Sequence, residues 1–206
     1  MKFNGFNDDD FQVFTIDGLE NRMEAIQQHI RPKLEYLGEY FSPALSTMTG
    51  DEMFYHVAKH ARRSVNPPDD TWVAFANNKR GYKKHPHFQI GLWKTHLFIW
   101  FAMIYEAPHK AEFGKKVEEN MEDIRSIIPP HFVWSGDHTK PDAVSFSSMS
   151  RDEFLALSER VQKVKKAEIL CGLQIDRKIV TDLSGNELVH KIENVFETLL
   201  PLYKMN

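Results

Sequence analysis

The sequence has little cysteine and no long hydrophobic segment. Its 206 residues include one cysteine, Cys171, so no intrachain disulfide can form, which fits a reducing cytosol. The longest apolar run, residues 97–105, is far shorter than the roughly 20 residues of a membrane helix. The N-terminal segment MKFNGFNDDDF has three consecutive aspartates and no apolar core, which argues against a signal peptide. We therefore expect a cytosolic protein without a membrane span.

The chain also lacks the common nucleotide-binding and nucleophile motifs. It contains no G-x-x-x-x-G-K-[ST] loop, no G-x-G-x-x-G after a predicted strand and no G-x-S-x-G nucleophile elbow. Cys171 stands in an apolar, alternating segment, which is typical of a small buried side chain rather than of a nucleophile. No motif indicates a cofactor. Any function must therefore be argued from charge, histidines and turns.

An apolar stripe at spacings of three and four extends over residues 19–48 and predicts a helix that packs on the core. Asp17 and Glu20 have the spacing of a capping box at its start. Pro32 removes a backbone donor, which predicts a kink or break, and Pro43 predicts a second interruption.

The remaining apolar segments alternate with period two or recur with helical spacing. Strands are predicted over residues 53–60, 71–76, 87–93, 95–105, 132–135, 143–147 and 167–175. Helices are predicted over residues 113–128, 150–164 and 184–199, the last two with capping boxes and the last closed by Pro201. Short connections between strands favour antiparallel pairing. The prediction is one compact α+β domain over residues 1–206, with a mainly antiparallel sheet packed by helices.

A segment of reversed charge, residues 56–93, lies inside this acidic chain. Seven lysines and arginines there face only two aspartates, a net charge of +5, whereas the whole chain carries −3. Such a segment indicates an anionic ligand. The candidate ligand-binding residues flank its turns: Arg62, Arg63, Arg80, Gly81, Tyr82, Lys83 and Lys84.

Each residue type in this set suits an anion. Gly81 permits close approach of backbone N–H groups, and the arginines offer bidentate contacts to phosphate or carboxylate. Trp72, Tyr82, His87 and Phe88 offer a stacking surface for a base. The sequence pI of about 6.4 argues against general binding of duplex nucleic acid. A phosphorylated small molecule, a nucleotide or a short single strand fits better.

Four histidines accompany the basic segment: His56, His60, His85 and His87. They are candidate acid–base groups, since histidine titrates near neutrality. The segment HVAKH has the spacing of a metal-binding helix but lacks the glutamate of H-E-x-x-H. Four imidazoles on adjacent strands offer ligands for a divalent ion, but the surrounding cations would repel it. We therefore predict no metal.

The run VAKHARRSVNPPDDTWVAFANNKRGYKKHPHFQIGL resembles the signature region of the bacterial YktB family. The segment VKKAEILCG, residues 164–172, resembles it as well, so the resemblance covers nearly the whole chain. It implies a cytosolic bacterial α+β domain of unknown function and transfers no functional residue.

Three functions remain open. The leading hypothesis is an anion-binding module for a phosphorylated small molecule or nucleotide. The alternatives are an enzyme that acts on such a ligand through histidines, and an interaction protein whose basic surface meets an acidic partner. Convergence of Arg62, Arg80 and Lys83 in a concave pocket would favour the first two, and a histidine bonded to a carboxylate inside it would favour the enzyme. The sequence does not specify the ligand, any reaction or the oligomeric state.

Overall fold

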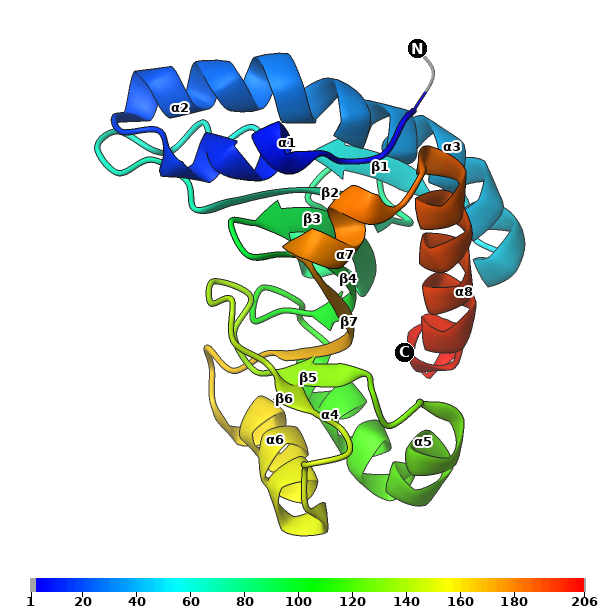
Figure 1. Cartoon of the computed structure of the whole chain (residues 1–206). Helices are drawn as coiled ribbons and strands as arrows, with labels where there is room; N and C mark the ends of the chain where they lie inside the picture. The colour runs from blue at the N-terminus through cyan, green and yellow to red at the C-terminus, as the bar shows by residue number, and fades with distance from the viewer. Residues whose placement is uncertain (1–2, 206) are drawn as a thin grey trace.

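The computed structural model describes residues 3–205 and builds them around one sheet (Figure 1). Within these residues the sheet has seven strands in the order β1-β2-β3-β4-β7-β5-β6, and every pairing is antiparallel. The strands are β1 (Phe54–Val57), β2 (Asp70–Ala76), β3 (His87–Trp93), β4 (His96–Met103), β5 (Val133–Ser135), β6 (Val144–Ser145) and β7 (Ile169–Asp176). The predicted α+β class with a mainly antiparallel sheet is confirmed.

Helices cover one face and the ends of this sheet. They are α1 (Asp8–Gln12), α2 (Leu19–Ala25), α3 (Arg31–Thr49), α4 (Lys110–Glu119), α5 (Met121–Ile127), α6 (Arg151–Lys163), α7 (Arg177–Asp182) and α8 (Gly185–Lys204). In Figure 1, α2 and α3 cross the top of the molecule and α8 runs down its right side. None of the described helices has the length and the apolar character that a membrane crossing requires.

Aromatic side chains join the sheet to the two longest helices. Phe196 of α8 contacts Phe41 of α3 edge-on, at 5.4 Å between ring centroids. It also contacts Phe75 of β2 and Phe88 of β3. The buried cluster around these rings extends from Phe3 to Tyr203, which supports the single-domain proposal.

The helical segment from α2 to α3 continues through Pro32 and Pro43 without a break. Between α2 and α3 the turn widens into a π-helical segment, Ile26–Ile30, and the Arg31 N–H donates to the Ile26 carbonyl. The sequence predicted a kink or break near Pro32. The wide π-helical turn accommodates the proline there, and the helix continues. The predicted interruption at Pro43 is wrong, because α3 continues to Thr49.

Two of the three predicted capping boxes are confirmed. Ser150 and Ser184 each accept the N–H of the glutamate three residues on, at the start of α6 and α8. The prediction at Asp17 is wrong: α2 begins after Gly18, whose φ is +83°, and has no side-chain cap. Helix α8 also runs through Pro201, which was expected to close it.

The Ser184 cap is expected to stabilise the protein measurably. Replacing Ser184 with alanine leaves the N–H of Glu187 without its acceptor, and such changes cost about 0.5–2 kcal/mol. Denaturant titration measures this loss. Thr198→Ala in the same helix is the control and should be nearly neutral, because alanine is the better helix former. Equal losses in both variants would contradict the role of the cap.

The other face of the sheet carries Trp72, Phe98 and Trp100 and is called the loop face here. Its strands contain glycines where a side chain would collide with these rings. A Cβ on Gly91 would meet the Phe98 ring at 2.3 Å, and one on Gly172 would meet the Trp100 ring at 2.8 Å. The glycines therefore let large aromatic rings lie against the strands.

Loops rather than long helices lie over the loop face. In the β2–β3 loop, the Tyr82 hydroxyl accepts from Nε1 of Trp72 at 2.8 Å. In the β5–β6 loop, the Pro141 carbonyl accepts from Nε2 of Gln174 at 2.8 Å. Each of these loops lines a separate cavity on the loop face.

Candidate functional site

A cleft of about 830 Å³ opens beside β1, between the segment that follows it and the β2–β3 loop, and is called the basic cleft here. Six of the seven predicted ligand residues line it: Arg62, Arg63, Gly81, Tyr82, Lys83 and Lys84. Arg80 does not line it; its N–H donates to the Asn78 side chain and its own side chain is exposed. Gly81 adopts φ +71°, a conformation that favours glycine at this tight turn.

Arg31, which sequence reasoning missed, also lines the basic cleft. The π-helical turn precedes it directly, and one guanidinium nitrogen, Nη2, donates to the Ala58 carbonyl at 3.3 Å. Its Nε atom is buried and has no hydrogen-bond partner among the described residues. Arg31 is far from the basic segment, residues 56–93, in the sequence. It reaches the basic cleft only because α3 packs beside it.

The cations of the basic cleft are poorly compensated by protein carboxylates. Glu35 and Glu106 line it, and Glu106 pairs with Lys83 at 3.8 Å. Among the described residues, Arg63 donates only to the backbone carbonyls of Asn66 and Pro67. Within residues 3–205, the other cations predicted or found here form no ion pair: Arg31, Lys59, Arg62 and Lys84.

Aromatic rings line part of the basic cleft. The indole of Trp72 is tied to Tyr82 by their hydrogen bond, and His56 stacks on Tyr82 at 5.3 Å between centroids. His60 meets Trp72 edge-on at 5.5 Å. Two flat rings, fixed next to several cations, provide a surface on which a ligand ring can stack.

His60 lies at the centre of this arrangement. Among the described residues it is the non-glycine residue with a positive φ, +49°, an uncommon conformation for a residue with a side chain. Burial, together with Arg63 and Arg31, lowers the pKa of His60 to about 4. The imidazole is therefore neutral at pH 7, and Nε2 lies 3.2 Å from the Thr71 hydroxyl.

The imidazoles of His56 and His87 are both hydrogen-bonded, and His85 does not line the basic cleft. His56 donates from Nε2 to the Asn78 carbonyl at 2.9 Å. His87 is fully buried; it donates from Nδ1 to the His85 carbonyl and accepts at Nε2 from Gln89. Phe88 lies in the core on the opposite face of the sheet. The predicted stacking surface is thus reduced to Trp72 and Tyr82.

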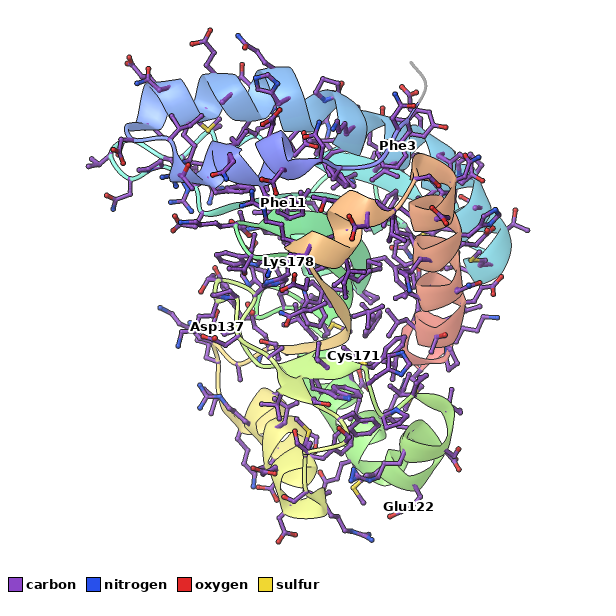
Figure 2. All side chains as sticks on the ribbon, in the orientation of Figure 1. Phe3, Phe11, Glu122, Asp137, Cys171 and Lys178 are labelled. Atoms are coloured by element: carbon purple, nitrogen blue, oxygen red, sulfur yellow. The ribbon has the colours of Figure 1, made fainter. Side chains whose placement is uncertain are left out.

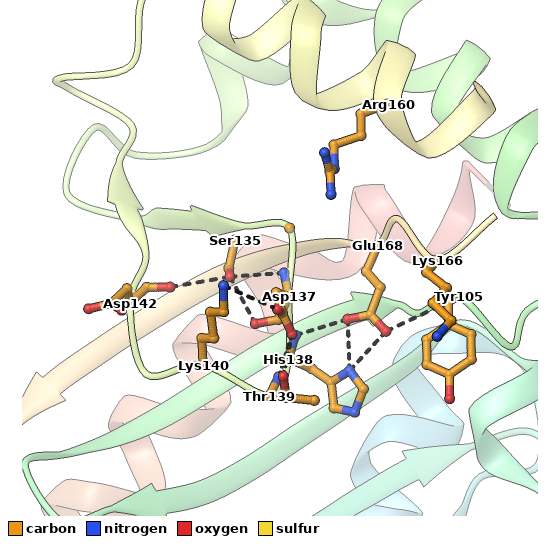
Figure 3. A pocket seen from close by; sticks show the side chains of 11 residues that line it. Tyr105, Ser135, Asp137, His138, Thr139, Lys140, Asp142, Arg160, Lys166 and Glu168 are labelled. Atoms are coloured by element: carbon orange, nitrogen blue, oxygen red, sulfur yellow. Dashed lines mark hydrogen bonds and ion pairs between the residues drawn. The ribbon is translucent and has the colours of Figure 1, made fainter. Parts of the chain in front are cut away.

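A second hollow of about 660 Å³, called the His138 cavity here, lies where β5 and β7 pair (Figure 3). Its central feature is a histidine bound to a buried carboxylate. Nδ1 of His138 donates to Glu168 at 2.7 Å, and the Glu168 side chain is only 3% exposed. Glu168 also accepts the backbone N–H groups of His138 and Tyr105. No hydrogen-bond partner of His138 Nε2 occurs among the described residues.

Local structure explains how the two partners meet. Ser135 pairs with Leu170 across β5 and β7, so the turn after β5 lies beside the residue before β7. In that turn, Asp137 accepts the N–H and the hydroxyl of Thr139, which fixes the backbone around His138. Sequence reasoning missed both members of the pair. The one available signal was a charged residue, Glu168, at the start of an apolar strand.

Asp137, His138 and Glu168 place three potential ligand atoms within 4.8 Å of one another. These atoms already have hydrogen-bond partners: Nδ1 of His138 donates to Glu168, and Asp137 accepts from Thr139. Lysines and an arginine line the same cavity: Lys140, Lys166 and Arg160. The arrangement is that of a hydrogen-bonded acid–base pair in a cavity lined by three cations and three carboxylates.

Cys171 lies at the centre of the molecule, as Figure 2 shows, and is buried. Burial raises the pKa of its thiol well above the usual value. Its thiolate is therefore strongly disfavoured, consistent with the packing role predicted from the sequence.

The fold and these hollows define an α+β protein that carries two ligand-sized sites on the loop face of an antiparallel sheet. A family model described as a domain of unknown function, DUF1054, matches residues 6–203. A UPF0637 protein of Bacillus velezensis is 58% identical over 200 residues, which cover 97% of this chain and 95% of the relative. A UPF0637 protein of Bacillus cytotoxicus is 51% identical over 205 residues, 100% of this chain and 99% of the relative.

The chain therefore belongs to the DUF1054 (UPF0637) family, and the predicted YktB-like relationship is confirmed. The family description and the names of these relatives state no activity. The function has to be argued from the geometry of the two sites.

Proposed function

We propose that this protein binds a small phosphorylated molecule or nucleotide in the basic cleft, in the bacterial cytosol. One observation carries the proposal: cations from α3, from the segment after β1 and from the β2–β3 loop surround one concave space. Like charges held together repel one another unless an anion compensates them. A bound phosphate group supplies that compensation.

The shape and lining of the cleft support a small ligand over the alternatives. The surface is concave, whereas a flat or convex basic face would suit an acidic protein partner. The buried Nε donor of Arg31 has no partner within residues 3–205, and burying such a group is costly unless a ligand satisfies it. Trp72 and Tyr82 add a stacking surface beside the charges. The ligand class that uses all three features is a phosphate joined to a flat ring.

Thermal shift with ADP, pyrophosphate and inorganic phosphate tests the proposal. A ligand at 100 times its Kd stabilises the folded state by about 2.7 kcal/mol, or about 5–10 °C in Tm for a chain of this size. The shift should rise with ligand concentration and shrink as inert salt is added. ADP should exceed pyrophosphate if the aromatic rings contribute.

Two matched variants make the test specific. Arg62→Ala/Lys84→Ala removes two exposed cations of the basic cleft and should abolish most of the shift. Lys94→Ala/Lys178→Ala removes two exposed cations outside the cleft and should leave the shift intact. The absence of dose-dependent stabilisation by any of the three compounds would contradict the proposal, as would equal loss in both double variants.

A further inference from the structure

We propose that the His138 cavity is a second, acid–base site, in which Nε2 of His138 accepts a proton from a hydroxyl group or water beside a small oxyanion-bearing ligand. The inference rests on the geometry of this cavity alone and does not depend on binding in the basic cleft. It assigns the acid–base role to His138 instead of the four predicted histidines. The charge pattern of the sequence did not indicate His138.

The hydrogen bond to Glu168 sets the tautomer of the imidazole. A carboxylate accepts but does not donate, so Nδ1 of His138 carries the hydrogen, and in the neutral imidazole Nε2 retains its lone pair. Figure 3 shows Nε2 on the side of the ring that points away from Glu168. His138 itself lines the cavity, and its side chain is 15% exposed. The reactive nitrogen is thus held in one orientation.

The buried carboxylate lies next to the charge that proton transfer creates. When an O–H bond breaks and its proton bonds to Nε2, the electron pair stays on the oxygen and the imidazole becomes positive. Glu168 then faces an imidazolium at 2.7 Å and stabilises it without moving. Its backbone contacts to His138 and Tyr105 keep it in place. Glu168 is the positioning residue, and His138 is the residue that meets the ligand.

Three cations and three carboxylates line the cavity, and the two cations that form no ion pair within residues 3–205 indicate where an oxyanion would bind. Arg160 of α6 and Lys166 form no ion pair within the described residues, and both line the cavity. In Figure 3 the Arg160 side chain extends from its helix toward the space above Glu168. Asp137 and Asp142 also line the cavity, and Lys140 pairs with Asp137 at 3.8 Å. Arg160 and Lys166, which form no ion pair among the described residues, are therefore the cations that would hold the oxyanion in this cavity.

Calorimetric titration with sulfate tests this site, because sulfate does not titrate near neutrality. The full-length Arg62→Ala/Lys84→Ala variant serves as the parent protein, so that binding in the basic cleft is weakened. Titrations in two buffers of different ionisation enthalpy report proton uptake on binding. We expect a fraction of one proton per sulfate, and we expect His138→Gln to abolish the uptake. Absence of sulfate binding, or binding without uptake, would overturn the proposal.

Two arginines of one helix supply the matched control. Arg160→Gln should weaken sulfate binding about three- to fivefold, as loss of an exposed charge contact does. Arg151→Gln, on the same helix but outside the cavity, should leave the affinity unchanged. Equal weakening in both variants would show that the overall charge, not this site, binds the anion.

Nitrogen NMR of the wild-type histidines supplies a readout that does not need a ligand. In its neutral form His138 should carry hydrogen on Nδ1 and none on Nε2, and Glu168→Gln should weaken that preference. Hydrogen on Nε2 in the wild-type protein would overturn the proposal. So would one zinc ion per chain that His138→Gln removes, because Nε2 would then be a metal ligand.

Discussion

Replacing Leu34 with alanine is expected to lower the free energy of unfolding by about 2–5 kcal/mol, the cost of a large-to-small change in a packed core. Leu34 is fully buried, on the stripe of α3 that faces the sheet. The loss combines the transfer energy of the missing methyl groups with the cavity that they leave. Urea titration monitored by circular dichroism measures the difference from the wild-type protein.

The position of Leu34 gives this variant a second use. It lies three residues after Arg31, so its packing also holds the α3 wall of the basic cleft. Val65→Ala is the control: Val65 is 76% exposed, and its truncation should change stability by less than about 0.5 kcal/mol. A Leu34→Ala loss no larger than that of the control would contradict the burial of the α3 stripe.

The strands were predictable because burial imposes a period on their side chains. Residues 87–93 alternate between the core face and the loop face, and the structure gives β3 these same limits. The segment 53–60 forms a shorter strand, because β1 ends at Val57 and His60 adopts a positive φ. The predicted helix over residues 113–128 is divided at Asn120 into α4 and α5.

The prolines show where a local rule is overridden by packing. Pro43 removes one backbone donor, but Leu37, Phe41 and Leu45 on either side of it are all fully buried. Continuing the helix keeps these three side chains in the core, and that burial outweighs one lost hydrogen bond. A rule based on the local sequence considers the proline alone and does not include the stabilisation gained by burying these side chains.

The two sites differ in how far the sequence could predict them. The basic cleft was largely indicated because most of its cations are close in sequence and stand in turns. The His138 cavity was not indicated, because His138 and Glu168 are 30 residues apart and no sequence motif links them. They meet only through the pairing of β5 with β7. Antiparallel pairing was predictable there, but its register was not.

The second large effect concerns pH and His87, which lies beneath the basic cleft. Its ring meets Tyr82 at 5.0 Å between centroids, so its protonation state bears on one wall of the cleft. Burial lowers the pKa of His87 from 6.5 to about 4. The unfolded chain therefore binds a proton at a higher pH than the folded chain does.

The sign of the effect follows from this depressed pKa. The stability due to a neutral His87 is fully present above pH 6.5 and is lost as the pH falls from 6.5 toward 4. The loss amounts to about 3 kcal/mol. Asp70 acts in the opposite direction: burial raises its pKa to about 7, so its contribution is present below its unfolded value of 3.8 and is lost as the pH rises toward 7. The wild-type curve contains both effects.

Comparison of variants isolates the histidine. The stability difference between the wild-type protein and His87→Gln should shrink by about 3 kcal/mol between pH 7 and pH 4, because the variant has no proton to gain there. His190→Gln, at an exposed position on α8, should run parallel to the wild type. Urea titrations at several pH values measure all three curves. If His87→Gln does not fold, NMR titration of the wild-type imidazole replaces it, and a ring that becomes charged near pH 6.5 would contradict the burial of His87.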